Sequence, residues 1–188
     1  MILRGFVPAL WLGWALYWWF AARNVKANEW SESPWSKLVH VAPLLLAFLL
    51  LSPARMPFDG MYAPIMPHTP IALWIGAALT ALGLAFAVWA RRHIGRNWSG
   101  TITIKVEHEL VTSGPYRIVR HPIYTGLLLA FVGTAIAIGQ WRGVAAVILA
   151  ALAIWRRVYL EEAGMRRRFG AAFEAYARRV AAVIPFVL

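Results

Sequence analysis

Apolar residues form five long runs along the chain, at residues 2–22, 38–52, 71–90, 122–139 and 143–159. Several of these runs approach the length of about 20 residues that spans a hydrocarbon layer about 30 Å thick. A water-soluble domain of this size could not bury all of them in one core. The pattern predicts an all-α integral membrane protein with about five transmembrane helices.

The second run is the shortest and contains Pro43. Three arrangements would let it cross a bilayer: a start near Pro34, a tilt, or local thinning of the membrane. The last two runs are joined only by residues 139–143, so they are expected to form an antiparallel hairpin. After it, Met165, Phe169, Phe173 and Tyr176 have the spacing of one helical face, which predicts a C-terminal amphipathic helix with a break at Gly170.

Basic residues divide unevenly between the two sides that five crossings would define. Sixteen of the 19 Lys and Arg residues fall on one side, and Arg4, Arg55 and Arg142 fall on the other. Because basic loops are retained in the cytoplasm, the amino terminus is expected outside and the carboxyl terminus in the cytosol. The chain is predicted to be a single membrane domain, with three amino-terminal helices in residues 1–90 and a cofactor-binding loop, helical hairpin and C-terminal helix in residues 91–188.

Composition narrows the class of function. Hydrophobic residues make up 61% of the chain and charged residues 14%, and the formal net charge is +11. No nucleic-acid recognition motif accompanies this charge, so anionic membrane lipid is the expected partner. The chain has no cysteine, and its five His residues form no close cluster with carboxylates, so no metal site is expected.

The cytosolic segment from Arg91 to His121 is rich in polar residues, with interleaved apolar ones that argue against disorder. Pro122 stands where a proline can open the fourth helix, which places Arg120, His121 and Tyr124 around its start. Unpaired N–H groups there favour a carboxylate, such as the amino-acid end of a cofactor. Arg120 as a membrane anchor and His121 as a capping residue are the simpler interpretations.

On the fifth helix, Arg157 and Glu161 lie at positions i and i+4, and Glu162 is adjacent. Carboxylates at this depth are costly unless they are paired or face a wet cavity, which makes both of them candidates for a site. Surface ion pairs are the alternative, because Glu162 with Arg166 has the same spacing.

Three motifs in the second half of the chain recur in one family of enzymes. They are Gly95-Arg96-Asn97-Trp98-Ser99-Gly100, the run from His108 to Arg117 that contains Gly114-Pro115-Tyr116-Arg117, and Arg120-His121-Pro122-Ile123-Tyr124-Thr125-Gly126. The double Glu161-Glu162, then Phe169-Gly170, Tyr176 and Ile184-Pro185, follow in the same order. The sequence resembles the isoprenylcysteine carboxyl methyltransferase family and its phospholipid methyltransferase relatives. The amino-terminal half carries no such resemblance.

This resemblance implies an integral membrane methyltransferase that uses S-adenosylmethionine and releases S-adenosylhomocysteine, without a Rossmann domain. It implies catalytic roles for Arg157 and Glu161, although Arg156 leaves that alignment open by one position. The implied cofactor-binding residues are His108, Leu110, Val111, Gly114, Tyr116, His121, Pro122, Tyr124, Glu161 and Glu162, to which the helix-start argument adds Arg120.

The expected acceptor is a lipophilic or lipidated molecule that reaches the site from the membrane. A carboxylate acceptor is already ionised and needs only orientation, whereas an amine needs a base such as Glu161, Glu162 or His121. The short chain is typical of a bacterial inner-membrane protein. Carboxyl O-methylation is preferred; the alternatives are phospholipid N-methylation, a membrane reductase of the sterol type that uses NADPH, and a non-catalytic scaffold.

Overall fold

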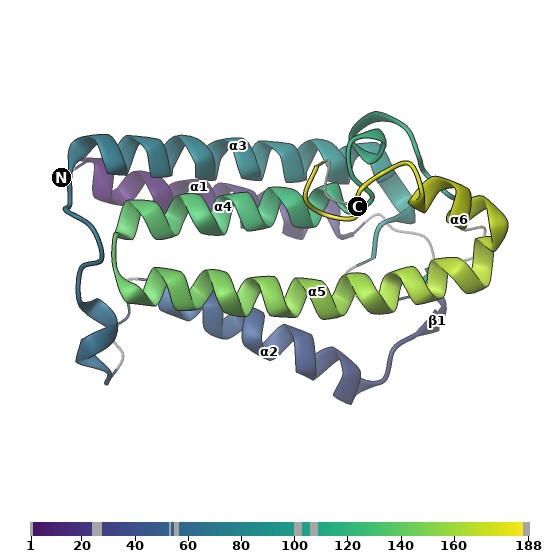
Figure 1. Ribbon diagram of the computed structural model, residues 1–188, viewed down its shortest axis with the longest axis horizontal. Coiled ribbons are helices and arrows are strands. Elements are labelled where there is room, and N and C mark those ends of the chain that lie inside the picture. The colour runs from purple at the N-terminus through teal and green to yellow at the C-terminus, as the bar shows by residue number, and fades with distance from the viewer. Residues whose placement is uncertain are drawn as a thin grey trace.

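The computed structural model describes residues 2–23, 28–52, 54, 57–99, 103–105 and 109–185. Its long helices are α1 (Ile2–Ala21), α2 (Pro34–Leu51), α3 (Pro70–Ile94), α4 (Pro122–Ile138) and α5 (Trp141–Phe169). They run along the long axis of the molecule, and α4 and α5 form the expected antiparallel hairpin (Figure 1). The predicted all-α fold is confirmed, and each of the five apolar runs forms a helix.

Two helices extend beyond the apolar runs that predicted them, and for α2 the alternative start near Pro34 is confirmed. Helix α2 begins at Pro34 because Pro34 occupies its first turn and the Ser33 side chain accepts a hydrogen bond from the Ser36 N–H at 3.2 Å. Helix α5 continues ten residues beyond Tyr159 and ends at Gly170, whose φ is +50°. The expected C-terminal amphipathic helix is therefore split between the end of α5 and a separate helix α6 (Ala171–Ala177).

Within the described residues, three helical segments are long and apolar enough to cross a membrane: Pro34–Leu51, Pro70–Asn97 and Trp141–Phe169. Helix α4 is apolar but shorter, at 17 residues. Large apolar side chains cover the outside of the bundle, and Trp35 and Trp155 are 76% and 70% exposed. Because that surface suits lipid and not water, the chain is an integral membrane protein.

Short elements lie between the long helices. Strands β1 (Asn28–Ser31) and β2 (Thr103–Lys105) pair antiparallel, with Trp30 opposite Ile104; neither strand was expected from the sequence. The short helices are η1 (Asp59–Tyr62), η2 (Gly95–Asn97) and η3 (Gly114–Arg117). The described parts of the predicted cytosolic segment are therefore folded onto the bundle.

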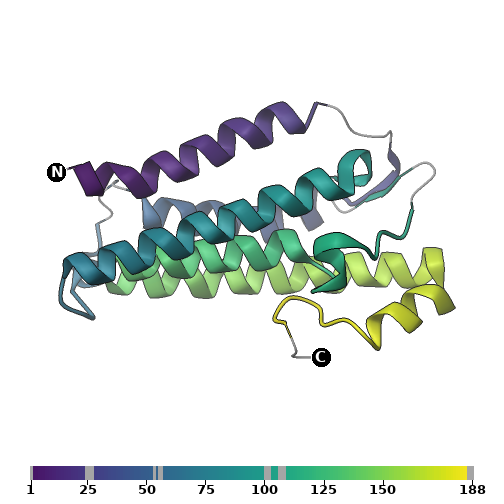
Figure 2. The ribbon, with the colours of Figure 1, turned by 90° about the horizontal axis from the view of Figure 1, so that it is seen from above.

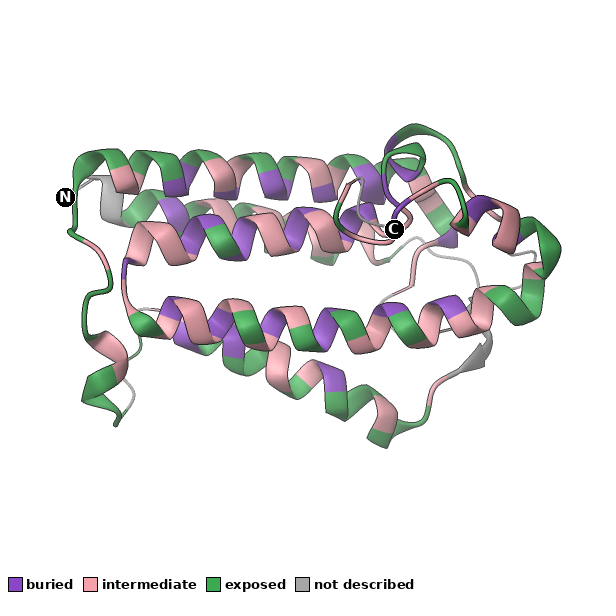
Figure 3. Ribbon diagram, viewed as in Figure 1, coloured by how far each residue is buried: buried purple, intermediate pink, exposed green. Residues whose placement is uncertain are grey.

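Helices α3 and α4 meet along four glycines, Gly76, Gly83, Gly126 and Gly133, here named the glycine seam. A Cβ atom on Gly83 would lie 2.4 Å from the Gly126 carbonyl oxygen, so only glycine fits there. Small residues allow helix backbones to approach closely where lipid provides no hydrophobic driving force. Buried positions follow the facing sides of these helices (Figure 3).

Aromatic side chains attach α1 to the bundle. The Trp11 indole Nε1 donates to Thr134 Oγ1 at 2.9 Å, and the ring packs edge-on against Phe48 and Phe131. Figure 2 shows α1 along one side of α3, with α4 and α5 on the other. Trp11 is thus a packing residue, while Trp35 and Trp155 face outward as interfacial tryptophans do.

Candidate active site

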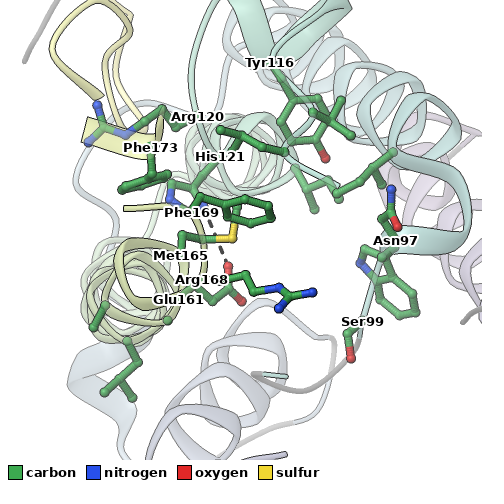
Figure 4. Close-up of a pocket in the computed structure, with 18 of the residues that line it drawn as sticks. Asn97, Ser99, Tyr116, Arg120, His121, Glu161, Met165, Arg168, Phe169 and Phe173 are labelled. Carbon is green, nitrogen blue, oxygen red and sulfur yellow. Dashed lines mark ion pairs between the residues drawn. The ribbon is translucent and has the colours of Figure 1, made fainter. Parts of the chain in front are cut away.

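A cavity of about 290 Å³ opens where the end of α3, the start of α4 and the last turns of α5 converge (Figure 4). Eight of the predicted site residues line it: Leu110, Val111, Tyr116, Arg120, His121, Pro122, Tyr124 and Glu161. Gly114, Arg157 and Glu162 lie outside its lining, and His108 lies outside the described residues. Residues from three separate stretches of sequence therefore meet at one place.

Local geometry brings Tyr116 and His121 to this cavity. Gly114 has a φ of +58°, and a Cβ atom there would lie 2.6 Å from the His93 ring, so a tight glycine turn packs on that ring. The η3 turn that follows buries Tyr116, and Pro122 opens α4 with His121 at the capping position. The prediction that Pro122 opens the fourth helix is confirmed.

Glu161 is the centre of the cavity wall. Its Oε1 accepts hydrogen bonds from the Tyr124 hydroxyl at 2.6 Å and from Arg157 Nε at 3.1 Å. His121 Nδ1 lies 3.6 Å from Oε2, and the His121 and Tyr124 rings stack with their centroids 5.7 Å apart. A carboxylate held by a cation and a hydroxyl is fixed in orientation. Figure 4 shows Glu161 facing the open centre of the site.

Glu162 has different partners, although it is the next residue. Its Oε1 accepts from Arg120 Nε at 2.9 Å and lies 3.2 Å from His121 Nε2, while Oε2 accepts from Arg166 Nη2 at 3.1 Å. Glu162 is buried, with 6% of its surface exposed. The two adjacent carboxylates are thus divided: Glu161 faces the cavity, and Glu162 joins α5 to the start of α4.

Residues 178–183, here named the C-terminal strap, lie along the start of α4. The N–H groups of Arg120 and His121 donate to the Ala181 and Ala182 carbonyls at 2.8 and 2.9 Å. Thr125 Oγ1 donates to the Val183 carbonyl at 2.6 Å. These bonds form a parallel pairing between the strap and the residues that precede α4.

Arg120 also binds this C-terminal region. Besides Glu162, its guanidinium donates to the Ala177 carbonyl at 2.9 Å and to the Val180 carbonyl. The backbone N–H groups of Arg120 and His121, which precede α4, are thus occupied by the strap, and the Arg120 guanidinium is bound by α5 and the C-terminal region.

Tyr176 makes a further link between α6 and the cavity wall. Its hydroxyl donates to the Tyr116 carbonyl oxygen at 2.5 Å. Burial raises the pKa of Tyr176 to about 12, so this hydroxyl stays protonated at neutral pH and keeps its donor role. Helix α6 therefore holds the backbone of Tyr116 in place.

The structure separates Arg156 from Arg157. Arg156 Nη1 donates to the Ser36 carbonyl and to His40 Nδ1, both at 3.1 Å, and so faces α2. Because a guanidinium only donates, His40 accepts through Nδ1 and carries its proton on Nε2, 3.4 Å from Glu32. Arg157 is the arginine beside Glu161.

The cavity also contains residues that the sequence analysis did not select. They are Glu32, Ser36, Ile94, Asn97, Trp98, Ser99, Glu109, Ile123, Leu160, Ala163, Gly164, Met165, Arg167, Arg168, Phe169, Phe173 and Tyr176. Asn97 and Trp98 belong to a motif that was recognised but given no role, whereas Glu32 and Ser36 come from the half of the chain without a resemblance. Among the described residues, no three His, Asp or Glu side chains are grouped so that they could hold a metal ion.

Comparison with known proteins places this geometry in a family. Residues 71–172 match the family model described as phospholipid methyltransferase. A probable protein-S-isoprenylcysteine O-methyltransferase of Oryza sativa subsp. indica is 32% identical over 135 residues, which are 69% of each chain. Protein-S-isoprenylcysteine O-methyltransferase B of Arabidopsis thaliana is 35% identical over 123 residues, 61% of each chain.

A solved structure, that of the eukaryotic intramembrane Ras methyltransferase ICMT, matches the fold with a TM-score of 0.57 and 24% identity. The match covers 85% of this chain and 55% of the solved one. The resemblance seen in the sequence motifs is thus confirmed across the membrane fold as well. Since the family model spans more than half of its residues, the chain belongs to the phospholipid methyltransferase family, and it is a membrane methyltransferase of the isoprenylcysteine carboxyl methyltransferase type.

Proposed function

We propose that the chain transfers a methyl group from S-adenosylmethionine to a lipophilic acceptor at the membrane, with carboxyl O-methylation of an isoprenylcysteine-like or other lipid substrate preferred. The observation that carries this proposal is the fixed carboxylate of Glu161 in the cavity wall, held by Tyr124 and Arg157 beside the His121 ring. The names of the relatives supply the acceptor class.

The cavity suits such a cofactor. When bound, S-adenosylmethionine supplies a methyl group made electrophilic by its sulfonium charge. A carboxylate beside aromatic faces attracts a positive charge, and Glu161, Tyr124 and His121 offer both. The apolar part of the cavity wall includes Leu110, Val111, Tyr116 and Pro122. The resemblance adds His108 to the proposed cofactor-binding residues.

The remaining predicted residues act behind this wall. Gly114 shapes the turn that carries Tyr116, and Arg120 with Glu162 holds the start of α4 in place. Arg157 reaches the cavity through Glu161, whose orientation it fixes. We therefore assign ligand contact to Glu161, and a positioning role to Arg157, Arg120 and Glu162.

The hydrogen bonds of both carboxylates favour an acceptor that is already ionised. Glu161 and Glu162 each accept hydrogen bonds from arginine, so neither carboxylate is unengaged and free to take a proton from an ammonium group. A carboxylate acceptor needs no base; the site has only to hold it close to the methyl group and to keep water out. Phospholipid N-methylation remains the second candidate because the family model carries that description.

The proposed topology follows from the charge distribution. Helices α3 and α5 bring the basic residues Arg91, Arg92, Arg166, Arg167 and Arg168 to the end that holds the cavity. Under the positive-inside rule this end faces the cytosol of a bacterial inner membrane, with all five helices crossing and residues 1–188 acting as one domain. The acceptor then approaches from the surrounding lipid.

Product chemistry tests the proposal directly. The purified chain in lipid nanodiscs is incubated with methyl-labelled S-adenosylmethionine and either N-acetyl-S-farnesylcysteine or phosphatidylethanolamine. We expect label in the prenylcysteine, released as methanol by mild base, and about 100-fold less label with the Glu161→Gln control. Base-stable label in phosphatidylethanolamine alone would establish N-methylation instead.

A further inference from the structure

Asn97 is a buried polar residue on the cavity wall. It is the last residue of η2, only 9% of its surface is exposed, and it lines the cavity. Its Oδ1 is enclosed, yet it accepts no hydrogen bond from any of the described residues. An unpaired buried polar atom is destabilising, so such atoms are rare and point to a role such as binding a ligand.

The fold holds Asn97 in this position from both sides. The Arg91 guanidinium donates to the Gly95 carbonyl at 2.8 Å and lies 4.5 Å from the centre of the Trp98 ring. Gly95 has a φ of +56°, and the Trp98 N–H donates back to its carbonyl. Because this turn is fixed by a buried arginine, the unpaired amide is a product of the fold and not of a loose loop.

The neighbours of Asn97 identify the kind of ligand. Trp98, Ile94, Leu110 and Val111 also line the cavity and are apolar or aromatic. Figure 4 shows Asn97 across the open centre of the site from Glu161. One amide between apolar side chains and a tryptophan suits a flat ring whose edge carries a hydrogen-bond donor next to an acceptor.

We propose that Asn97 binds such an edge, and that the edge belongs to the adenine of the methyl donor. An asparagine amide pairs with adenine by accepting from its amino group and donating to a ring nitrogen. The donor then lies across the cavity, with its base at Asn97 and its charged end at Glu161. This inference rests on the proposed function. The other source of the same chemistry is an amide group of a lipidated acceptor.

The test compares wild type with Asn97→Leu, which has nearly the same shape and no polar atoms. The probes are S-adenosylhomocysteine and 5′-methylthioadenosine, which lacks the amino-acid end. We expect both to bind at least 10-fold more weakly to Asn97→Leu. Thermal unfolding of the ligand-free variant should be unchanged or shifted upward, because an unpaired buried amide has been removed.

The outcomes are distinct. Unchanged affinity for both probes overturns the inference, and so does weaker binding that only accompanies a lower unfolding temperature. A raised KM for the acceptor, with donor affinity unchanged, assigns Asn97 to an acceptor amide and overturns the adenine assignment. If wild type binds neither probe, the proposed function itself fails.

Discussion

The glycine seam and the polar end of the bundle are built by opposite means. Along the seam, α3 and α4 touch through backbone atoms and leave no space for one additional carbon. At the polar end, long charged side chains hold α4, α5 and α6 around a cavity of about 290 Å³. The seam holds α3 and α4 together without charged side chains. The charged residues at the polar end can therefore be arranged around the cavity.

The largest expected effect is at the seam. Gly83→Ala places a Cβ 2.4 Å from the Gly126 carbonyl oxygen, and neither backbone can move aside without parting the helices. We expect a loss of more than about 3 kcal/mol of unfolding free energy, measured by thermal or denaturant unfolding in detergent. Gly13→Ala is the matched control in α1, where a new Cβ meets nothing within 4 Å and should be neutral or stabilising. Equal free energies of unfolding for the two variants would contradict a close backbone contact at the glycine seam.

The next effect concerns Glu162. Glu162→Gln leaves the mostly buried Arg120 guanidinium without a carboxylate, whereas Arg166 keeps its ion pair with Glu174. Removing one partner of a buried ion pair typically costs about 3–5 kcal/mol, and we expect the lower end of that range. Unfolding of the purified variant measures this cost. A normal unfolding temperature combined with lost donor binding would instead place Glu162 at the ligand.

Glu161→Gln should produce the reverse result. Its side chain faces the cavity and keeps its shape as an amide, so we expect an unfolding temperature close to that of wild type. Methyl transfer should fall by about 100-fold, or 2.7 kcal/mol, because the fixed negative charge is lost. Radiolabel transfer by the two Glu variants, normalised to folded protein, compares the carboxylates directly. Substantial activity in Glu161→Gln would remove this residue from the reaction.

The smallest effect tests the strap. Thr125→Val removes the hydrogen bond to the Val183 carbonyl, whereas Thr125→Ser keeps it. We expect a loss of about 1 kcal/mol in the valine variant and faster amide hydrogen exchange at Arg120 and His121. The serine variant should retain slow exchange. If valine and serine behave alike, the strap does not hold the start of α4.

Apolar periodicity predicted the helices because lipid exposure leaves long uncharged runs in the sequence. It predicted the break at Gly170 but not that α5 continues to it without interruption from the apolar span, a stretch that carries ion pairs such as Glu162 with Arg166. The sequence did not predict the strap because its contacts use the backbone carbonyls of Ala181 and Ala182, which any residue would provide.

The site could be predicted in part. Motifs indicated His121, Tyr124 and Glu161, which the fold brings together. They could not show which residue of the pairs Glu161–Glu162 and Arg156–Arg157 faces the cavity. Neighbouring residues on a helix point about 100° apart, and only the packing of α2 and α4 against α5 decides between them. Asn97 lay within a recognised motif, but its unpaired amide appears only in three dimensions.

Calorimetric titration of the purified chain with S-adenosylhomocysteine tests the central claim most directly, with NADPH as the competing ligand. The account predicts saturable binding of S-adenosylhomocysteine at one site per chain in wild type, marked weakening in Glu161→Gln, and no binding of NADPH. A folded wild-type protein that binds NADPH and not S-adenosylhomocysteine would contradict it.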